Sequence, residues 1–423
     1  MANVKIIIPR SEFLDSDRVM PAIGPLYLKS FLENKGHNVT IDDTPNEDSL
    51  GELDNYDVIG LSTTTPQYEI GGRHLARQIK EIALHTKLII GGTHAKFYTS
   101  DILEENLFDH IVRGDGEIAF LDILEGKNLP VVVSYPNLTE EEINSFPLPW
   151  RDKQYLSKYH YTIGDRNATT AITGKNCPMG CKYCESRRSG LTLFSVDRID
   201  AEINSIKEAG FDSIMFFDDI FAINEKRTHE LCDIIKPHNI TFRCFGHAKL
   251  LHQNTKVLSM LAESGCKEVG FGAESGDQGI LDTVGKGNKV EEVERTIANI
   301  LIAGMRVSAF FMIGLPGESE QTICETERLI AKFAANSSFR FDYAIYYPYK
   351  GTYIRDHLQE FDIQFHLEGS IGYYKGSKGL SECCVSTSHL TQDQIISHRN
   401  RIIQRYQENF KGKESSQQSS KST

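Results

Sequence analysis

Residues 174–184 read GKNCPMGCKYC and place three cysteines, Cys177, Cys181 and Cys184, in the spacing CxxxCxxC. Pro178 and Gly180 between them favour a turning loop over a helix or a strand. Thiolates are soft, high-affinity ligands for iron–sulfur clusters and for zinc. Three thiolates leave one iron of a four-iron cluster without a protein ligand, and chemistry is expected at that iron.

A structural zinc site is the alternative for this loop. Zinc takes a fourth protein ligand and usually uses closely spaced pairs of cysteines, whereas no second CxxC and no HxxxH is present. Tyr183, an aromatic residue directly before the third cysteine, and the position of the loop after a predicted strand both favour a redox cluster.

A hydrophobic content of 40% is typical of a globular protein. A chain of 423 residues is longer than one hydrophobic core usually supports, so two or three domains are expected. No apolar run reaches the length of a membrane span or of a signal-peptide core, so we expect a cytoplasmic protein without a membrane span. The net charge of −12, without a block of basic residues, argues against a nucleic-acid partner. Nine cysteines, an odd number, argue against a disulfide framework.

Residues 1–130 alternate short apolar runs with helical patterns, which predicts a doubly wound parallel sheet in an α/β domain. Such sheets bind ligands beyond the carboxyl ends of their strands, and small residues there would admit a planar ligand. No GxGxxG follows the first strand, which disfavours a Rossmann nucleotide site. The small residues at these strand ends are Ser62, Thr63, Thr64, Gly91, Gly92, Gly114 and Gly116.

After a proline-rich linker expected over 131–165, strands and helices alternate again. Strands are expected at 169–173, 213–217, 240–245, 267–271, 306–313 and 341–346. Six such units predict a partial (β/α)6 barrel over 166–350, whose catalytic groups lie on the loops after the strands. Residues in that position are the cysteine loop, Asp218, Asp219, His247, Lys249, Glu274, Ser275 and the turn from Gly314 to Glu318.

The end of the chain is expected to be a small helical region over 351–410. Thr391 and Gln394 have capping-box spacing and predict a helix over 391–407. Residues 411–423 contain no apolar side chain, which predicts a disordered tail. The neighbours Cys383 and Cys384 are interpreted as free thiols, with a redox-active pair as the alternative.

With Tyr183 included, the cysteine loop resembles the CxxxCxφC signature of radical S-adenosylmethionine (SAM) enzymes, where φ is aromatic. The resemblance implies that Cys177, Cys181 and Cys184 are catalytic and hold a 4Fe–4S cluster. The fourth iron of that cluster then chelates SAM. One electron, from a donor such as flavodoxin or ferredoxin, cleaves the sulfonium and yields a 5′-deoxyadenosyl radical. Lys175-Asn176 stands where many relatives carry Arg-Gly, and the lysine keeps the charge.

Three further motifs of the family follow in order over 168–350. The segment 217–219 resembles the motif that contacts the methionine ammonium, 272–275 the ribose and carboxylate motif, and 313–318 the adenine motif. An ammonium needs an acceptor, a ribose hydroxyl suits a carboxylate, and adenine needs a close backbone, which glycine allows. The implied SAM-binding residues are Tyr183, Asp218, Asp219, Glu274, Ser275, Gly314, Gly317 and Glu318.

Residues 1–130 resemble the cobalamin-binding domain that precedes the barrel in one subgroup of this family. The resemblance lies in segments 62–64, 91–94 and 114–117, and it adds Glu117 to the candidate cobalamin-binding residues. The DxHxxG motif is absent, so cobalamin is expected without a histidine from that motif. His94 is interpreted as a loop histidine on the rim, because no partner that would orient it as a ligand is evident.

These features together predict a cobalamin-dependent radical SAM enzyme. Methylcobalamin would supply a methyl group to an unactivated carbon, or a phosphorus, of a small molecule or peptide. The alternatives are a radical cyclisation, oxidation or rearrangement that uses cobalamin differently or not at all, and a cobalamin- or cluster-binding sensor without turnover. Candidate substrate contacts, each equally well an ordinary loop residue, are His247, Lys249, Tyr347 and Lys350.

Overall fold

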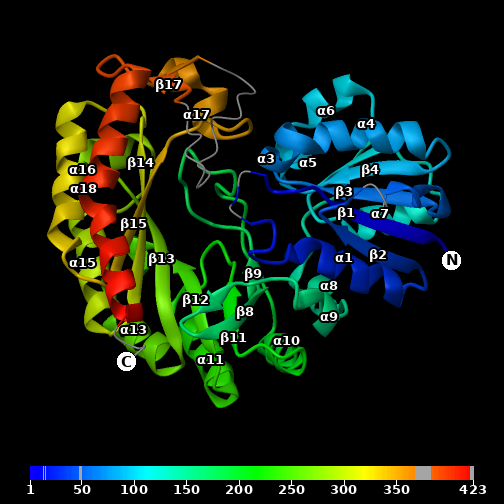
Figure 1. Cartoon of the computed structure of the whole chain (residues 1–423), viewed down its shortest axis with the longest axis horizontal. Helices are drawn as coiled ribbons and strands as arrows, with labels where there is room; N and C mark the ends of the chain where they lie inside the picture. Colours follow the sequence, from blue (N-terminus) through cyan, green and yellow to red (C-terminus); the bar gives the residue numbers. More distant parts are fainter. Residues whose placement is uncertain (13, 15, 47–49, 367–382, 420–423) are drawn as a thin grey trace.

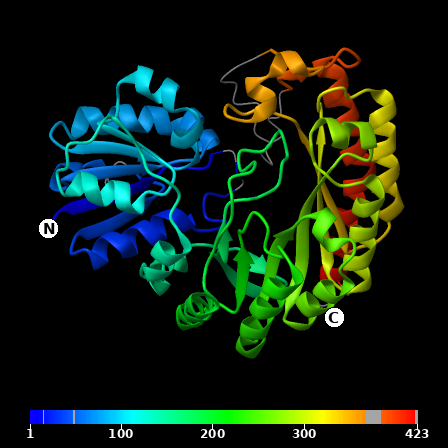
Figure 2. The same ribbon diagram turned by 180° about the vertical axis from the view of Figure 1, so that it is seen from behind.

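The computed structural model describes residues 1–12, 14, 16–46, 50–366 and 383–419, with side chains as far as residue 406. Two parallel sheets stand side by side, the N-terminal one in blue and cyan and the second in green to yellow (Figure 1). The view from behind shows the two ends of the chain on different halves of the molecule (Figure 2). Within the described ranges, no helix has the length and apolar character needed to cross a membrane.

The first sheet has the strand order β2-β1-β3-β4-β5-β6, and every pairing is parallel. Its strands are β1 (Asn3–Ile8), β2 (Asn38–Asp43), β3 (Val58–Ser62), β4 (Lys87–Gly91), β5 (His110–Arg113) and β6 (Val132–Ser134). The main helices beside it are α1 (Ile23–Asn34), α4 (Arg73–Ile82), α5 (Thr93–Phe97), α6 (Thr99–Glu105) and α7 (Glu117–Leu124). Successive residues such as Ile6 and Ile7 enter different core clusters, so both faces of the sheet are covered, as predicted.

The predicted linker contributes more structure than expected. Strand β6 extends the first sheet, because the β-branched run 131–133 pairs with β5. Helix α8 (Glu140–Ser145) begins at a capping box formed by Thr139 and Glu142. Strand β7 (Thr162–Ile163) then pairs antiparallel with the first strand of the second sheet.

The second sheet has the order β15-β14-β13-β12-β11-β8-β7, and its six main strands are parallel. They are β8 (Arg166–Ala171), β11 (Ser213–Phe216), β12 (Thr241–Gly246), β13 (Cys266–Glu274), β14 (Arg306–Ile313) and β15 (Phe339–Ile345). The outer helices are α10 (Val196–Glu208), α11 (Glu225–Ile235), α13 (Thr255–Glu263), α15 (Val290–Ile302) and α16 (Glu320–Phe333). This arrangement confirms the predicted six-stranded partial barrel.

The C-terminal region packs on the last barrel strand. It contains α17 (Tyr353–Asp356), the pair β16 (Gln364–Phe365) and β17 (Val385–Ser386), and α18 (Gln392–Ser419). The prediction of disorder from residue 411 is wrong as far as Ser419, where α18 ends, and 420–423 lie outside the described residues. Lys, Glu and Gln favour a helix even without an apolar face. Cys383 is a buried free thiol, as interpreted, and Cys384 beside it is also buried.

Directional polar contacts join the two halves. The Tyr27 hydroxyl on α1 donates to Glu202 on α10 at 2.9 Å, and Arg151 donates to the same carboxylate at 2.6 Å. Lys175, just before the first cysteine, pairs with Asp115 after β5 at 2.7 Å. The cysteine loop is therefore tied directly to the end of the first sheet.

A matched pair of glycine variants tests the backbone that ends the barrel helices. Gly265 has φ +107°, and a Cβ there would lie 2.3 Å from the Ile240 carbonyl oxygen, whereas Gly304, at φ +78°, would meet nothing within 4 Å. Gly304→Ala should cost about 1–2 kcal/mol of unfolding free energy for the left-handed backbone alone. Gly265→Ala should cost clearly more in chemical denaturation, and equal losses would contradict the close approach.

Candidate active site

The cysteine loop is closed on itself by hydrogen bonds. The backbone N–H of Cys177 donates to the Ser189 hydroxyl at 3.0 Å, and the N–H of Arg188 donates to the Met179 carbonyl at 2.8 Å. The N–H of Lys182 donates to the carbonyl of Val284 in the loop after β13 at 2.8 Å. The three cysteines are thus held on a shaped loop at the carboxyl end of β8.

The three thiols lie within electrostatic reach of one another. Burial, with the charges of Cys181, Asp219 and Cys177, raises the pKa of Cys184 to about 12. Burial also raises the pKa of Cys177. Thiolates at these positions need a positive partner, which bound iron supplies, so the residues fit a cluster.

The arrangement differs from that of a single-ion site. Among the described residues, no three His, Cys, Asp or Glu side chains come together in a way that could hold one metal ion. A four-iron cluster offers a separate iron to each thiolate, so its ligands need not converge on one point. The separation of the three thiols is therefore compatible with a four-iron cluster.

The carboxylate of Asp218 makes its hydrogen bonds within the protein. Its carboxylate accepts hydrogen bonds from the Thr173 N–H at 2.9 Å and from the Thr173 hydroxyl at 2.6 Å, and it is 3% exposed. Burial raises the pKa of this carboxyl to about 7. Because its carboxylate is buried in these hydrogen bonds, Asp218 is not positioned for the predicted contact with the methionine ammonium. The neighbouring Asp219 is exposed and lines a cavity with Cys184.

Glu274 forms a buried cluster with two residues from other loops. Its Oε1 accepts from the Tyr183 hydroxyl and from Lys286 Nζ, both at 2.7 Å, and Lys286 also reaches the Tyr183 oxygen at 3.1 Å. Glu274 itself has φ +60°. Burial alone would lower the pKa of Lys286, but the charges of Glu274, Cys181 and Cys184 raise it above its usual value. The Glu274–Lys286–Tyr183 cluster thus ties β13 to the cysteine loop.

Lys286 is the site residue that sequence reasoning missed. It lies between Gly285 and Gly287, both with positive φ, in a loop without apolar periodicity. The only sequence signal is a lysine flanked by glycines on the loop after the fourth barrel strand. Ser275, which was predicted, is fully buried and bonds to the Thr326 hydroxyl at 3.1 Å, so it braces the strand end.

The turn after β14 is shaped by Glu318. Its buried carboxylate accepts from the N–H groups of Gly314 and Leu315, and burial raises its pKa to about 8. Gly314 has φ +86°, and a Cβ there would lie 3.0 Å from the Val385 side chain. Gly317 has φ +80°, and its N–H donates to the Asp362 carbonyl at 3.0 Å. The side chain of Glu318 therefore stabilises the turn, and an adenine contact here would come from the backbone.

Two cavities lie where the two sheets meet. The smaller, of about 210 Å³, is lined by Ser62, Gly91, Gly92, Gly114, Gly116 and Glu117, together with Ile172 and Lys175 of the barrel. The larger, of about 700 Å³, is lined by Thr64 and Thr93 on one side and by Tyr183, Cys184, Glu185 and Asp219 on the other. Most predicted cobalamin-binding residues thus border a cavity; Thr63 is buried at 3% exposure and lines neither.

The glycines at these strand ends have different structural roles. A Cβ on Gly91, Gly114 or Gly116 would meet nothing within 4 Å, so they open the smaller cavity. A Cβ on Gly92 would lie 2.5 Å from the Thr63 carbonyl oxygen, so this glycine lets two loops approach. An apolar cavity opened by glycines beside a large shared one fits a bulky cofactor with a buried part, as cobalamin requires.

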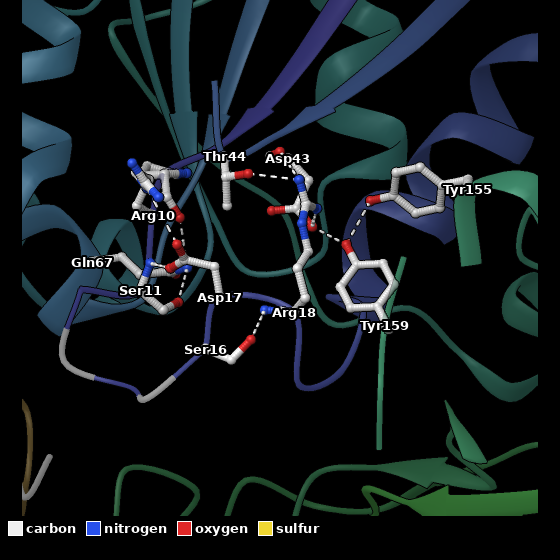
Figure 3. Close-up of polar contacts among 11 residues, drawn as sticks. Arg10, Ser11, Ser16, Asp17, Arg18, Asp43, Thr44, Gln67, Tyr155 and Tyr159 are labelled. Atoms are coloured by element: carbon white, nitrogen blue, oxygen red, sulfur yellow. Dashed lines mark hydrogen bonds and ion pairs between the residues drawn. The ribbon is translucent and has the colours of Figure 1, made fainter. Parts of the chain in front are cut away.

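The loop after β1 forms one wall of the larger cavity. Figure 3 shows the polar contacts of this loop. Asp17 accepts from Arg10 Nε at 3.2 Å and from the Ser11 N–H at 2.5 Å. Arg18 pairs with Asp43 at 2.8 Å, and the Tyr159 hydroxyl donates to the same carboxylate. The carboxylates at this wall are neutralised by arginines of the same loop.

His94 does not lie on the rim as predicted. It is 1% exposed on α5, with ring centroids 4.3 Å from Tyr68 and 4.8 Å from Tyr98. Burial, with the charges of Arg73 and Lys350, lowers its pKa to about 3, so the ring stays neutral. His94 packs as an aromatic residue.

The candidate substrate contacts do not form one surface. Lys350 pairs with Asp101 at 2.8 Å, and Lys249 lines cavities with Gln253, away from the cysteine loop. His247 is 5% exposed and Tyr347 is 8% exposed. Their places on loops after strands did not indicate where the side chains point.

Comparison with known proteins agrees with both halves of this site. Residues 171–330 match the model of the radical SAM superfamily, and residues 14–124 match that of the B12 binding domain. The chain is 25% identical over 404 residues to an uncharacterised methyltransferase of Pyrococcus horikoshii, covering 89% of this chain and 85% of that protein. It is 24% identical over 310 residues to cytidylyl-2-hydroxyethylphosphonate methyltransferase of Streptomyces wedmorensis, covering 62% of this chain and 58% of that enzyme.

The fold is also known from experiment. The radical SAM methyltransferase TsrM of Kitasatospora setae, solved with cobalamin and a 4Fe–4S cluster bound, superimposes with a TM-score of 0.70 at 15% identity, covering 89% of this chain and 83% of TsrM. A likeness at this identity establishes the fold alone. The two family matches, with the residues that fit each group, identify residues 171–330 as a radical SAM domain and residues 14–124 as a B12-binding domain, and these domains imply a 4Fe–4S cluster, SAM and cobalamin as the cofactors.

Proposed function

We propose that this enzyme methylates an unactivated carbon, or a phosphorus, of a small molecule or peptide. One observation carries the proposal. The cavity of about 700 Å³ has the cysteine loop on one wall and the end of the first sheet on the other. A group held at each wall therefore faces the same space, as the transfer of a methyl group to a substrate radical requires. The methyltransferase names of the two relatives support the same reaction.

The residues take distinct roles in this proposal. Cys177, Cys181 and Cys184 hold the cluster, and the exposed carboxylate of Asp219 receives the ammonium of SAM. The backbone at 272–274 and 314–317 holds the ribose and adenine. Bound cobalamin supplies the methyl group, and the cluster supplies the electron that cleaves SAM.

The positioning residues hold this arrangement. Asp218 fixes the strand end before the cysteine loop, and Glu318 fixes the turn after β14. Lys286 holds Tyr183 and Glu274 beside Cys184. Their rigid, buried hydrogen bonds keep the reacting groups in one geometry.

The smaller cavity is assigned to the buried part of cobalamin. Gly91, Gly114 and Gly116 open it, and the Lys175–Asp115 pair closes it against the barrel. Its lining is mainly apolar with a few polar groups, among them Asp115, Glu117 and Lys175, which is the usual character of a cofactor pocket.

Product analysis tests the reaction. The protein is reconstituted anaerobically with iron, sulfide and hydroxocobalamin, reduced, and incubated with SAM. We expect both 5′-deoxyadenosine and S-adenosylhomocysteine, because radical formation and methyl loading consume separate SAM molecules. Deoxyadenosine alone would favour the cyclase, oxidase or rearrangement alternative and contradict methyl transfer.

The same assay identifies the cluster ligands. Cys184→Ala should lose the absorbance of the cluster and both products, whereas Cys324→Ala, an exposed cysteine on α16, should retain them. A Cys184→Ala protein that keeps a full cluster would overturn the ligand assignment.

Removal of the buried ammonium should disturb both stability and turnover. Lys286→Met leaves Glu274 as an uncompensated buried carboxylate, so we expect a loss of about 3–5 kcal/mol in unfolding free energy. Adding Glu274→Gln should recover part of that loss, since the unpaired charge is gone. Denaturation of both variants and of the outer-surface control Lys289→Met checks this; an unaffected Lys286→Met would contradict the buried pair.

Filling the smaller cavity should separate the two cofactors. Gly116→Val places a side chain into open space within the cavity, so retention of cobalamin after desalting should fall while the absorbance of the cluster stays. The cluster serves as the control within the same sample. Full retention of cobalamin by Gly116→Val would show that the cavity is not its site.

A further inference from the structure

Three phenylalanines form a row on the inner face of the barrel. The ring of Phe217, directly after β11, is 6.2 Å from that of Phe245 on β12, and the Phe245 ring is 6.0 Å from that of Phe310 on β14. Phe217 is 42% exposed, and the other two are only partly buried. Among the described residues, none of the three belongs to a hydrophobic core cluster. The fold therefore leaves an apolar aromatic surface that its own packing does not use.

Strand β13 shows how deep the row lies. A Cβ on Gly270 would be 2.8 Å from the Phe245 ring and 3.1 Å from the Phe310 ring, while one on Gly272 would be 2.6 Å from Lys286 Nζ. Residues two apart on a strand share a face and are about 7 Å apart. The row thus lies one side-chain layer below the Glu274–Lys286–Tyr183 cluster.

A polar floor closes the barrel below the row. Glu268, two residues before Gly270, accepts from Arg243 Nε at 2.9 Å and from the Ser308 hydroxyl at 2.7 Å. The side chain of Glu268 is 8% exposed. The aromatic surface is therefore an apolar band one layer thick, with buried charges above and below it.

The row is continuous with the proposed active site. Phe217 directly precedes Asp218 and Asp219, and Asp219 borders the larger cavity beside Cys184. Gly270 lacks a side chain that would separate Phe245 from Phe310, so the two rings meet across β13. A flat group lying on this band would contact ring faces and edges, and at Phe217 it would lie two residues along the chain from Asp219, which lines the cavity.

We propose that Phe217, Phe245 and Phe310 bind the ring of the substrate, and that this substrate carries a planar aromatic or conjugated group. The inference rests on the proposed function and names the substrate class of that site. A planar ring gains edge-to-face or offset contacts beyond its buried area, whereas an aliphatic group gains the area alone.

Equilibrium dialysis with two simple probes tests this surface. Indole and cyclohexanol are each dialysed against the reconstituted enzyme with SAM and quantified by chromatography. We expect indole to bind at least about fivefold more tightly than cyclohexanol, and Phe217→Ala and Phe310→Ala to weaken indole by about fivefold or more. Phe333→Ala, which removes a partly buried ring from the outer helix α16, should leave indole binding unchanged.

The outcomes separate the two proposals. Thermal unfolding and the absorbance of the cluster show which variants are folded. Because Phe217 is exposed, its replacement should destabilise the fold less than the replacement of Phe310. Equal binding of the two probes, or indole binding that survives in the folded Phe217→Ala and Phe310→Ala proteins, would overturn the ring site. Loss of S-adenosylhomocysteine from the wild-type product mixture would instead overturn methyl transfer and leave the probe result standing.

Discussion

The buried pair of Glu274 and Lys286 is the contact on which the site depends. Two charges removed from water are tolerated only with close pairing and further hydrogen bonds, and here the Tyr183 hydroxyl completes the set. Since Tyr183 lies directly before the third cysteine, the pair fixes where the cysteine loop sits above the barrel. The charges of Cys181 and Cys184 are close enough to raise the pKa of Lys286, so the ammonium also faces the cysteine loop. One contact thus couples the strand end, the loop and the thiolates.

The alternation of strands and helices and the chemistry of the cysteine loop were accessible from the sequence because they rest on short-range patterns. Apolar runs alternating with helical spacing predict parallel sheets, and the spacing of Cys177, Cys181 and Cys184 predicts a shared inorganic group. The placement of β6 was missed because its strand is short and lies among prolines. The helix beyond residue 411 was missed because polar composition was taken to mean disorder, although Lys, Glu and Gln are good helix formers.

Side-chain direction was the part that sequence did not reveal. Asp218 and Asp219 look equivalent in the chain, yet one turns inward to Thr173 and the other faces the cavity. His94 was expected on the rim and is stacked between tyrosines. Lys286 had no pattern around it, because its role arises from three loops that only the fold brings together. Such roles depend on long-range packing, which residue spacing does not encode.

The shared wall of the larger cavity has a thermodynamic consequence. Neither sheet encloses that space alone, so a molecule bound there contacts both halves and its binding energy also holds them together. By linkage, a molecule that binds both halves favours formation of the Lys175–Asp115 and Lys350–Asp101 contacts by the same factor by which formation of those contacts tightens its binding. Salt, which screens partly exposed ion pairs, would then lower cofactor retention by weakening the Lys175–Asp115 and Lys350–Asp101 contacts.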